Sequence, residues 1–572
     1  MALTETRHDS TAGHAEGSPG GLSDSPLVTL DAYFGAGDHK VVGRLWLLGS
    51  VLFLLAGAVI SLVAAAEHTD LGAFTISDDA AGFAQLWSLG RDLLIFGGLI
   101  PMFVALAIYV VPLQVGSFSL AFPRGAAAAF WTWLVGIILV IVSYAAGGGP
   151  GGWSTDHVVM WAAALGFVVL ALLWAMVCIA STVLGARTAG MDLDRVPVAS
   201  WGFLVFSLGG LFSLPLVVAQ LVLAYLDVKH GFLPDETSRI PLVGVTDSVS
   251  LAPGLYWLGV PALAIAVEAI GVHTGRPVRF HRPVLALLGL LGVVAYGADM
   301  FTFASRGRQI AFDNGLLVAA LIASVLPVLA TLGLAGDSLR TGALRLRTPL
   351  VAGLLSGLLL LSGAAAALLG VIWPIVGFLN KNFDTDLSLD VSLDLAATTF
   401  HEGIFGLIVG AAVLGGIAGI HHWAHKIWGR SLDDRLGLTT SLAAAGGGLV
   451  WGVGGIIAGF LGQVRLPNVG ETIPDGAEAM NGVSTAGVAL LTLAALLLLA
   501  NIGKAATGSG SANEPWQGLS LEWATPSPPP LSNFAALPVV RSATPLADPE
   551  FLIPASAVAT DAATTASPTE HA

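Results

Sequence analysis

Charged side chains are scarce in this sequence of 572 residues: Asp, Glu, Lys and Arg together make up 11%, whereas hydrophobic residues make up 55%. Because a soluble domain carries roughly a quarter charged residues, the composition excludes an ordinary soluble globule and indicates a membrane protein with many spans.

Cysteine is almost absent as well. The single one, Cys178, lies inside an apolar run, which excludes an internal disulfide and a thiolate metal cluster. Residues 1–28 hold no apolar segment suited to a cleavable signal peptide, so insertion is expected to begin with the first span.

Long apolar runs recur along the chain, each of about twenty residues and therefore long enough to cross the hydrocarbon layer as a helix. They predict an all-α polytopic membrane protein whose main domain covers residues 38–503. A polar N-terminus, 1–37, precedes it, and a tail rich in Pro, Ser and Ala, 504–572, follows it and is expected to lie along the cytoplasmic face or to be disordered. The twelve predicted spans are 43–65, 93–115, 128–147, 157–185, 201–226, 255–272, 284–304, 314–335, 350–373, 400–424, 437–463 and 484–503.

The loop charges are divided between the two sides of the membrane. An even number of spans places both termini on one side, and the basic loop residues fall on that side, so both termini are predicted to be cytoplasmic. The acids gather on the other side, which accounts for the net charge of −14 without a nucleic-acid partner. The basic residues concerned are Arg124, Arg187, Arg195, Arg276, Arg279, Arg282, Arg340, Arg345, Arg347, Lys426, Arg430 and Arg435.

Several short motifs follow one another along the chain, each occurring once. The run 38–45, DHKVVGRL, precedes the first span; PLQVG and AFPR follow the second span at 112–116 and 121–124; and LEWATPSPPP stands in the tail at 521–530. Together with the loop 426–436, these segments resemble subunit I of the heme-copper respiratory oxidases. The resemblance implies a twelve-helix bundle in a bacterial plasma membrane that holds two hemes and a copper ion, reduces oxygen and takes up protons from the cytoplasm.

The histidines that the family uses for its metals are missing from the matching positions. Six-coordinate heme iron needs two strong axial ligands, yet Gly90 stands at the ligand position of the second span, and Gly403 and Phe405 stand at the pair of the tenth. At the copper positions, Val260 replaces the histidine of the sixth span, and Ala298 and Asp299 replace the pair of the seventh. The resemblance therefore predicts no copper site, and a heme only if its ligation is non-standard.

Two residues remain as candidate cofactor-binding groups. His401 lies two residues from a ligand position, and a short alignment shift would make it one of the two heme ligands. Arg465 matches an arginine that pairs with heme propionates in the family, although an arginine at a membrane interface also serves simply as a snorkelling cation. No catalytic or metal-ligating residue is predicted.

Arg91 and Asp92 are expected at the outer end of the second span, just before its apolar run. Ionisable residues near the outer ends of the spans need partners, because charge is costly in an apolar span. We hypothesise that Arg91 pairs with Asp299, and also with Glu402, in place of lost cofactor contacts; the alternative is that each faces water.

At the cytoplasmic end of the tenth span, His421, His422 and His425 stand close in sequence. Packing beside Trp423 and Trp428 is favoured over a metal site there, since a metal would need further ligands and the nearby Lys426 disfavours a cation.

Three functions are consistent with these patterns, and enzymatic activity stays open. The preferred one is a cofactor-depleted paralogue of subunit I with a structural or accessory role, in contact with membrane lipid and other respiratory subunits. The second is a working terminal oxidase with non-standard ligands. The third is a transporter or channel on the same scaffold.

Overall fold

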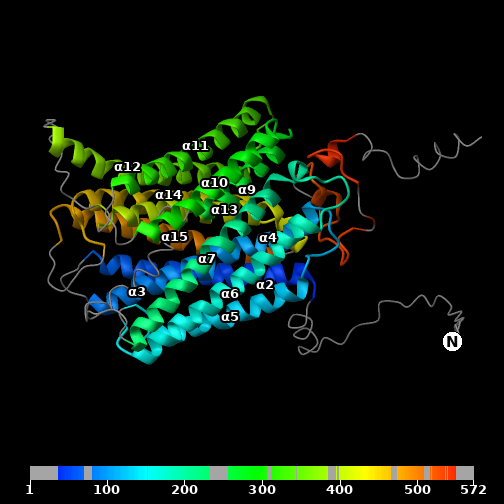
Figure 1. The fold of residues 1–572 in the computed structure, drawn as a ribbon. Helices are drawn as coiled ribbons and strands as arrows, with labels where there is room; N and C mark the ends of the chain where they lie inside the picture. The colour runs from blue at the N-terminus through cyan, green and yellow to red at the C-terminus, as the bar shows by residue number, and fades with distance from the viewer. Residues whose placement is uncertain are drawn as a thin grey trace, which may run out of the picture. The chain divides into compact units, whose positions relative to one another are not determined.

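The computed structural model describes the helical bundle and parts of the tail. The described residues are 37–69, 80–150, 152–230, 256–305, 311–342, 344–383, 395, 398–465, 473–507, 516, 518–534, 536 and 539–548. They form helices and no strand, and the long helices lie side by side (Figure 1). The long helices are α2 (His39–Glu67), α3 (Ala80–Asp92), α4 (Ile100–Gln114), α5 (Pro123–Ala145), α6 (Thr155–Gly185), α7 (Val198–His230), α9 (Tyr256–Thr274), α10 (His281–Ser305), α11 (Ala311–Thr341), α12 (Thr348–Phe383), α13 (Phe400–Trp428), α14 (Asp434–Phe460) and α15 (Ala477–Thr507).

The predicted all-α membrane architecture is confirmed, since each predicted span coincides with one of these helices. Among the described residues, eleven helices are long and apolar enough to cross a membrane, and the described apolar part of α10, His281–Ala295, is shorter. The second span differs from the prediction. It begins at the start of α3 and runs through a π-helical segment, η1 (Leu93–Leu99), into α4 as one helix, so residues 91 and 92 lie well inside it and not at its outer end.

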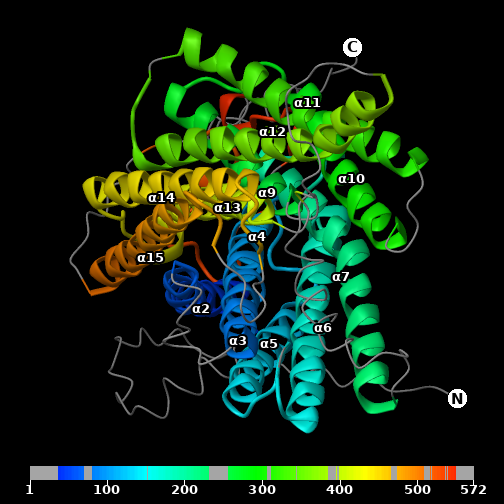
Figure 2. The same cartoon turned by 90° about the vertical axis from the view of Figure 1, so that its left-hand side faces the viewer.

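Two spans form the centre of the bundle. The most apolar parts of α13 and of the α3–η1–α4 helix are buried throughout, and in the view along the bundle α4 and α13 are surrounded by the other helices (Figure 2). Glycines let α13 approach α14 closely: a Cβ added to Gly410 would lie 2.7 Å from Cα of Gly448. Such small residues allow tight helix packing where lipid supplies no hydrophobic driving force between helices.

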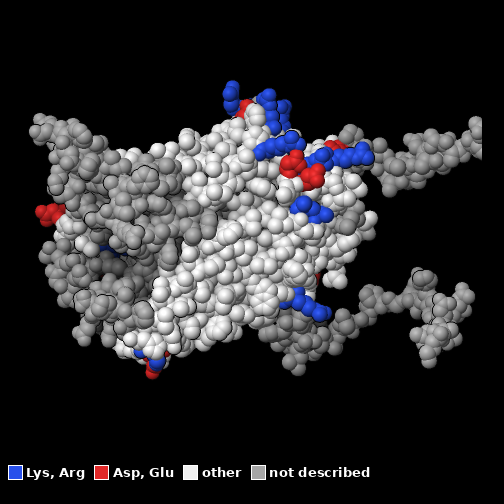
Figure 3. Space-filling view, in the orientation of Figure 1, with Lys and Arg blue, Asp and Glu red and all other residues white. Residues whose placement is uncertain are grey.

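One end of the bundle is capped by the tail, and we call it the tail end. Lys40, at the start of α2, donates hydrogen bonds of 3.1 Å to the carbonyl of Leu531 and to Oδ1 of Asn533. Gln114, at the end of α4, donates to Glu522 at 2.8 Å. Burial raises the pKa of the Glu522 carboxyl above its ordinary value. Lys and Arg side chains gather toward this end (Figure 3). Ion pairs of exposed arginines occur among them, such as Arg282 with Asp194 at 2.6 Å.

The N-cap of α14 predicts a pH effect at the tail end. The Asp433 carboxylate accepts bonds from Lys504 and from the backbone N–H groups of Leu436 and Arg435, and these bonds, the one from Lys504 above all, lower its pKa. A lowered folded-state pKa stabilises the protein above the unfolded value, and this stabilisation is lost as the pH falls through the folded value. We therefore expect Lys504→Met to move the acid-induced loss of helicity to higher pH, measured by circular dichroism in detergent.

The control for this prediction is Lys229→Met, which removes the partner, 3.4 Å away, of Asp156. Because the Asp156 side chain is 87% exposed and its charge is screened by water, this change is expected to leave the acid transition unchanged. Identical acid transitions for Lys504→Met and the unchanged protein would contradict the role given to Lys504.

Candidate functional site

An ion pair lies inside the bundle, toward the end opposite the tail end. The Arg91 guanidinium of α3 donates to both carboxylate oxygens of Glu402 in the first turn of α13, and the two side chains are only 5% and 14% exposed. Trp87 stands one helical turn before Arg91, and Phe405 stands three residues after Glu402. Their ring centroids lie 3.9 and 4.0 Å from the guanidinium carbon, so Arg91 is held by charge and by two aromatic faces at once.

This pair confirms one of the two partners predicted for Arg91, namely Glu402. The other, Asp299, lies in α10, but its side chain is outside the described residues. Since both halves of the pair are nearly buried, each charge depends on the other for its stability.

A small cavity lies beside the ion pair. Its volume is about 70 Å³, which corresponds to roughly two waters at about 30 Å³ each. A ligand of drug or cofactor size occupies a pocket of roughly 300–1,000 Å³, so a porphyrin does not fit between these side chains as they stand. The lining residues include Arg91, Glu402, Phe405, Trp451, Arg465 and Asn481.

The positions that match the family's heme ligands lie in direct contact with neighbouring helices. A Cβ added to Gly90 would lie 2.6 Å from Oγ of Ser61 in α2. A Cβ added to Gly403 would lie 2.4 Å from the carbonyl oxygen of Gly452 and 2.5 Å from the backbone nitrogen of Ile456 in α14. A real Cβ essentially never comes this close to another atom. Gly403 meets backbone atoms and has no room for an imidazole, whereas a side chain at Gly90 would require Ser61 to move, with the Ser61 backbone nitrogen 3.2 Å from the added Cβ. The residues present therefore do not fit a heme with the family's ligation.

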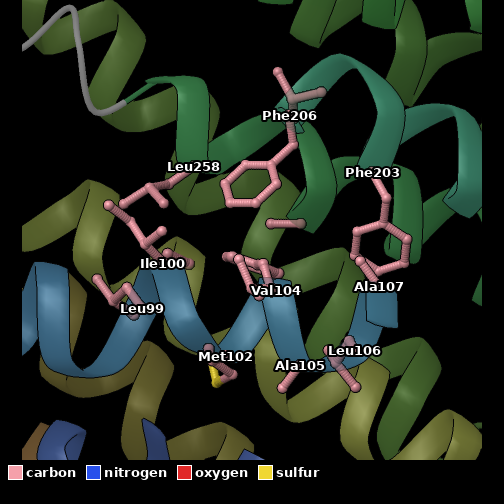
Figure 4. Close-up of a cluster of buried hydrophobic side chains, with 14 of the residues drawn as sticks. Leu99, Ile100, Met102, Val104, Ala105, Leu106, Ala107, Phe203, Phe206 and Leu258 are labelled. Carbon is pink, nitrogen blue, oxygen red and sulfur yellow. The ribbon is translucent and has the colours of Figure 1, made fainter. Parts of the chain in front are cut away.

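The region of the family's copper is apolar and filled. Val260 and Ala262 on α9 are fully buried, and a Cβ added to Gly415 of α13 would lie 2.4 Å from Cβ of Ala262. Buried apolar side chains of α4 pack nearby against those of α7 and α9: Val104 points toward Phe206, and Ile100 lies beside Leu258 (Figure 4). In the described part of the chain, no group of three or more His, Cys, Asp and Glu side chains is arranged to hold a metal ion. The donors that copper requires are not supplied by these residues.

The two candidate cofactor-binding residues occupy different surroundings. Arg465 lines the cavity, with its guanidinium carbon 5.9 Å from the Trp87 ring centroid. His401 is not among the lining residues, and its ring lies 6.0 Å from that of Phe400, edge to face. Both assignments stay predictions: Arg465 lines the same cavity as the ion pair, whereas His401 does not line it.

A buried aspartate is the polar group that sequence reasoning placed wrongly. Asp92 is fully buried, and its Oδ2 accepts hydrogen bonds of 2.9 Å from Tyr144 Oη and from Trp161 Nε1. It was expected at a helix end because the apolar run begins at residue 93, whereas the helix begins at Ala80. Aspartate inside a buried helix needs such donors, because charge and unpaired polar atoms are both costly there. The π-helical segment η1 follows directly, as such segments often do at functional positions.

Comparison with known proteins agrees with this architecture. The family profile described as cytochrome C and quinol oxidase polypeptide I matches residues 41–490. Cytochrome c oxidase subunit 1 of Thermostichus vulcanus is 28% identical over 88% of this chain and 90% of its own length. The subunit 1 of Bacillus subtilis is 28% identical over 89% of this chain and 81% of its own length.

A solved structure shares the fold. A heme-copper terminal oxidase dimer studied by cryo-EM superposes with a TM-score of 0.60 at 15% identity, covering 84% of this chain and 86% of that one. The profile match spans most of the sequence, and the matches cover 81–90% of the length of these relatives. The chain therefore belongs to the family of cytochrome c and quinol oxidase polypeptide I, the subunit I family of oxidase complexes.

Proposed function

We propose that this chain is a cofactor-depleted member of the subunit I family, with a structural or accessory role in a respiratory complex. The observation that carries the proposal is the close helix contact at Gly90 and Gly403. At these two positions the neighbouring Ser61 side chain and the Gly452 backbone occupy the space that an imidazole would need. These positions thus lack both the imidazole donors that a heme needs and the space for them. A bundle packed this way does not depend on a bound cofactor for its stability.

Side chains of this chain take over the contacts that hold the helices together. The Arg91–Glu402 pair joins the second span to α13, and Trp451 packs edge to face on Phe405 with ring centroids 5.4 Å apart. Such interactions give the bundle a defined arrangement between its central helices, which is what an accessory subunit needs in order to present a constant surface to partners.

We further propose its setting. Other oxidase subunits and membrane lipid are the partners expected of a subunit I relative, and the bacterial relatives point to a bacterial plasma membrane. With the basic residues gathered near the tail end, the positive-inside rule supports cytoplasmic termini.

The alternative is an active terminal oxidase with non-standard ligands, for which Arg465 beside the cavity is the favourable observation. A heme assay separates the two. The chain would be purified in detergent from cells with ample heme, next to a relative that carries the family's histidines, and its heme content measured from the reduced spectrum. We expect far less than one heme per chain, with co-purification of other oxidase subunits. Stoichiometric heme with a reduced absorption band would overturn the proposal.

A further inference from the structure

A pair of histidines is buried at the tail end of the bundle. The Arg91–Glu402 ion pair lies toward the opposite end. His273 near the end of α9 is 1% exposed and His422 near the end of α13 is 0% exposed, and their ring centroids lie 6.2 Å apart. Neither nitrogen of either ring has a hydrogen-bond partner among the described residues. The pair joins two helices that are far apart in sequence, so the sequence pattern, which drew attention only to the run 421–425, did not reveal it.

Unpartnered nitrogens of this kind call for an explanation. A buried polar group left without a partner costs about 1–3 kcal/mol, and such groups are rare in native structures. The neighbouring His421 shows the ordinary solution: its Nδ1 lies 2.9 Å from the carbonyl of Ile417, and its Nε2 lies 3.2 Å from the amide nitrogen of Asn501. At the same end of α13, one imidazole therefore has a partner for each of its ring nitrogens, whereas the next imidazole has a partner for neither.

Indole rings surround the pair. His422 packs edge to face against Trp423 and Trp523, with centroid distances of 4.9 and 5.5 Å. Trp516 of the tail lies 4.9 Å from His273 and 6.2 Å from His422. Indole faces attract cations and exclude water. The surroundings thus favour a cation of low charge bound to the imidazoles themselves.

The separation of the rings narrows the choice of ion. With metal–nitrogen distances of about 2 Å, an ion lying between two imidazole nitrogens in near-linear geometry sets the ring centroids about 6 Å apart, whereas a tetrahedral ion draws them closer. Zinc also needs four donors, and no third His, Cys, Asp or Glu ligand is grouped with the pair in the described part of the chain. Imidazole is a common copper donor, and monovalent copper, with its filled d shell, accepts two ligands in a line.

Nearby positive charge opposes any bound cation, and it limits the charge that such an ion can carry. The buried Lys426 ammonium donates to the carbonyl of Thr525 at 2.7 Å and lies 5.4 Å from the Trp523 ring centroid. A positive charge near the indole cluster raises the cost of burying a divalent ion more than that of a monovalent one.

We propose that His273 and His422 bind one Cu(I) ion under the indole cluster of Trp423, Trp516 and Trp523. The site is separate from the copper position of the family, which lies at Val260 on the same helix, and it does not depend on the function proposed above. Binding ties the ends of α9 and α13 to the tail through Trp516.

The test is anaerobic titration of the full-length protein in detergent with Cu(I), in competition with a colorimetric Cu(I) chelator. To remove copper bound by the N-terminal histidines, all proteins carry His8→Ala and His14→Ala. We expect one Cu(I) per chain. Because loss of even an outer-shell partner lowers metal affinity 10–100-fold, His273→Phe and His422→Phe are each expected to weaken binding by more than about 100-fold. The matched control, His157→Phe, removes a partly buried histidine on α6 and is expected to bind as before.

Two further measurements keep the outcome decisive. X-ray absorption of the copper-loaded protein that carries only His8→Ala and His14→Ala is expected to show two nitrogen donors, and it does not depend on the folding of the His273 and His422 variants. Zn²⁺ is expected not to displace the copper. Undiminished copper binding by the His273→Phe/His422→Phe protein, an absence of copper binding altogether, or equal affinity for Zn²⁺ would each overturn the assignment.

Discussion

Replacing Arg91 by methionine is expected to destabilise the protein by about 3–5 kcal/mol, the usual cost of breaking a buried ion pair from one side. The carboxylate of Glu402, only 14% exposed, would be left without its cation, and the stacking of the guanidinium between Trp87 and Phe405 would be lost as well. The measurement is the free energy of unfolding in mixed detergent, followed by the loss of helicity as the denaturing detergent increases.

The matched controls separate the buried charge from simple truncation. Arg91→Met combined with Glu402→Met removes both charges and is expected to recover a large part of the loss, since two apolar residues replace the pair without leaving an unpaired ion. Arg279→Met removes a 73% exposed arginine whose partner, Asp337, lies 3.6 Å away, and is expected to cost less than about 1 kcal/mol. Equal losses for Arg91→Met and Arg279→Met would show that the inner pair does not stabilise the bundle.

The second large effect is expected at Gly403, where even alanine does not fit. Its Cβ would lie 2.4 Å from the Gly452 carbonyl oxygen and 2.5 Å from the Ile456 nitrogen, and both obstacles are backbone atoms that a rotamer change does not move. Gly403→Ala must therefore separate α13 from α14. Overpacking typically costs about 1–3 kcal/mol, and we expect the upper part of this range in the same unfolding assay.

Gly482→Ala is the control for this substitution. Gly482 lies in α15, and a Cβ added there meets nothing within 4 Å. Alanine at a helical glycine with open space is expected to stabilise by about 0.5–1 kcal/mol. If Gly403→Ala were as stable as Gly482→Ala, space would exist at the heme-ligand position, and the main support for a cofactor-depleted protein would be lost. By the same reasoning, Gly90→His with Gly403→His is expected to lower the yield of folded protein without restoring heme.

Several features followed directly from the sequence. Apolar runs of fixed length must cross the membrane as helices, because lipid offers no partner to backbone N–H and C=O groups. That constraint is local, so it predicted where the spans lie, and the predicted ends of α13 and α14 fall within four residues of the observed ones. The ordered motifs from residue 38 to residue 530 predicted the family, which the profile match over 41–490 confirms.

The placement of polar groups could not be obtained in this way. Asp92 was assigned to a helix end because hydropathy counts apolar residues and does not register that a moderately polar stretch, 80–92, continues the same helix. Glu402 could be named as a partner of Arg91 only as one of two choices. Their pairing depends on how α3 and α13 approach each other, which no local pattern encodes.

The amino-acid sequence by itself determined that the chain is an all-helical membrane protein of the oxidase subunit I family. It also predicted twelve spans and an absence of imidazoles where the family holds its metals. Only the tertiary structure decided what fills those places. Helices pack against one another at Gly90 and Gly403. Arg91 pairs with Glu402, and the ring of His273 lies next to the ring of His422. The physical reason is that span formation depends on each segment's own hydropathy, whereas side-chain contacts depend on distances between helices that are hundreds of residues apart in the chain.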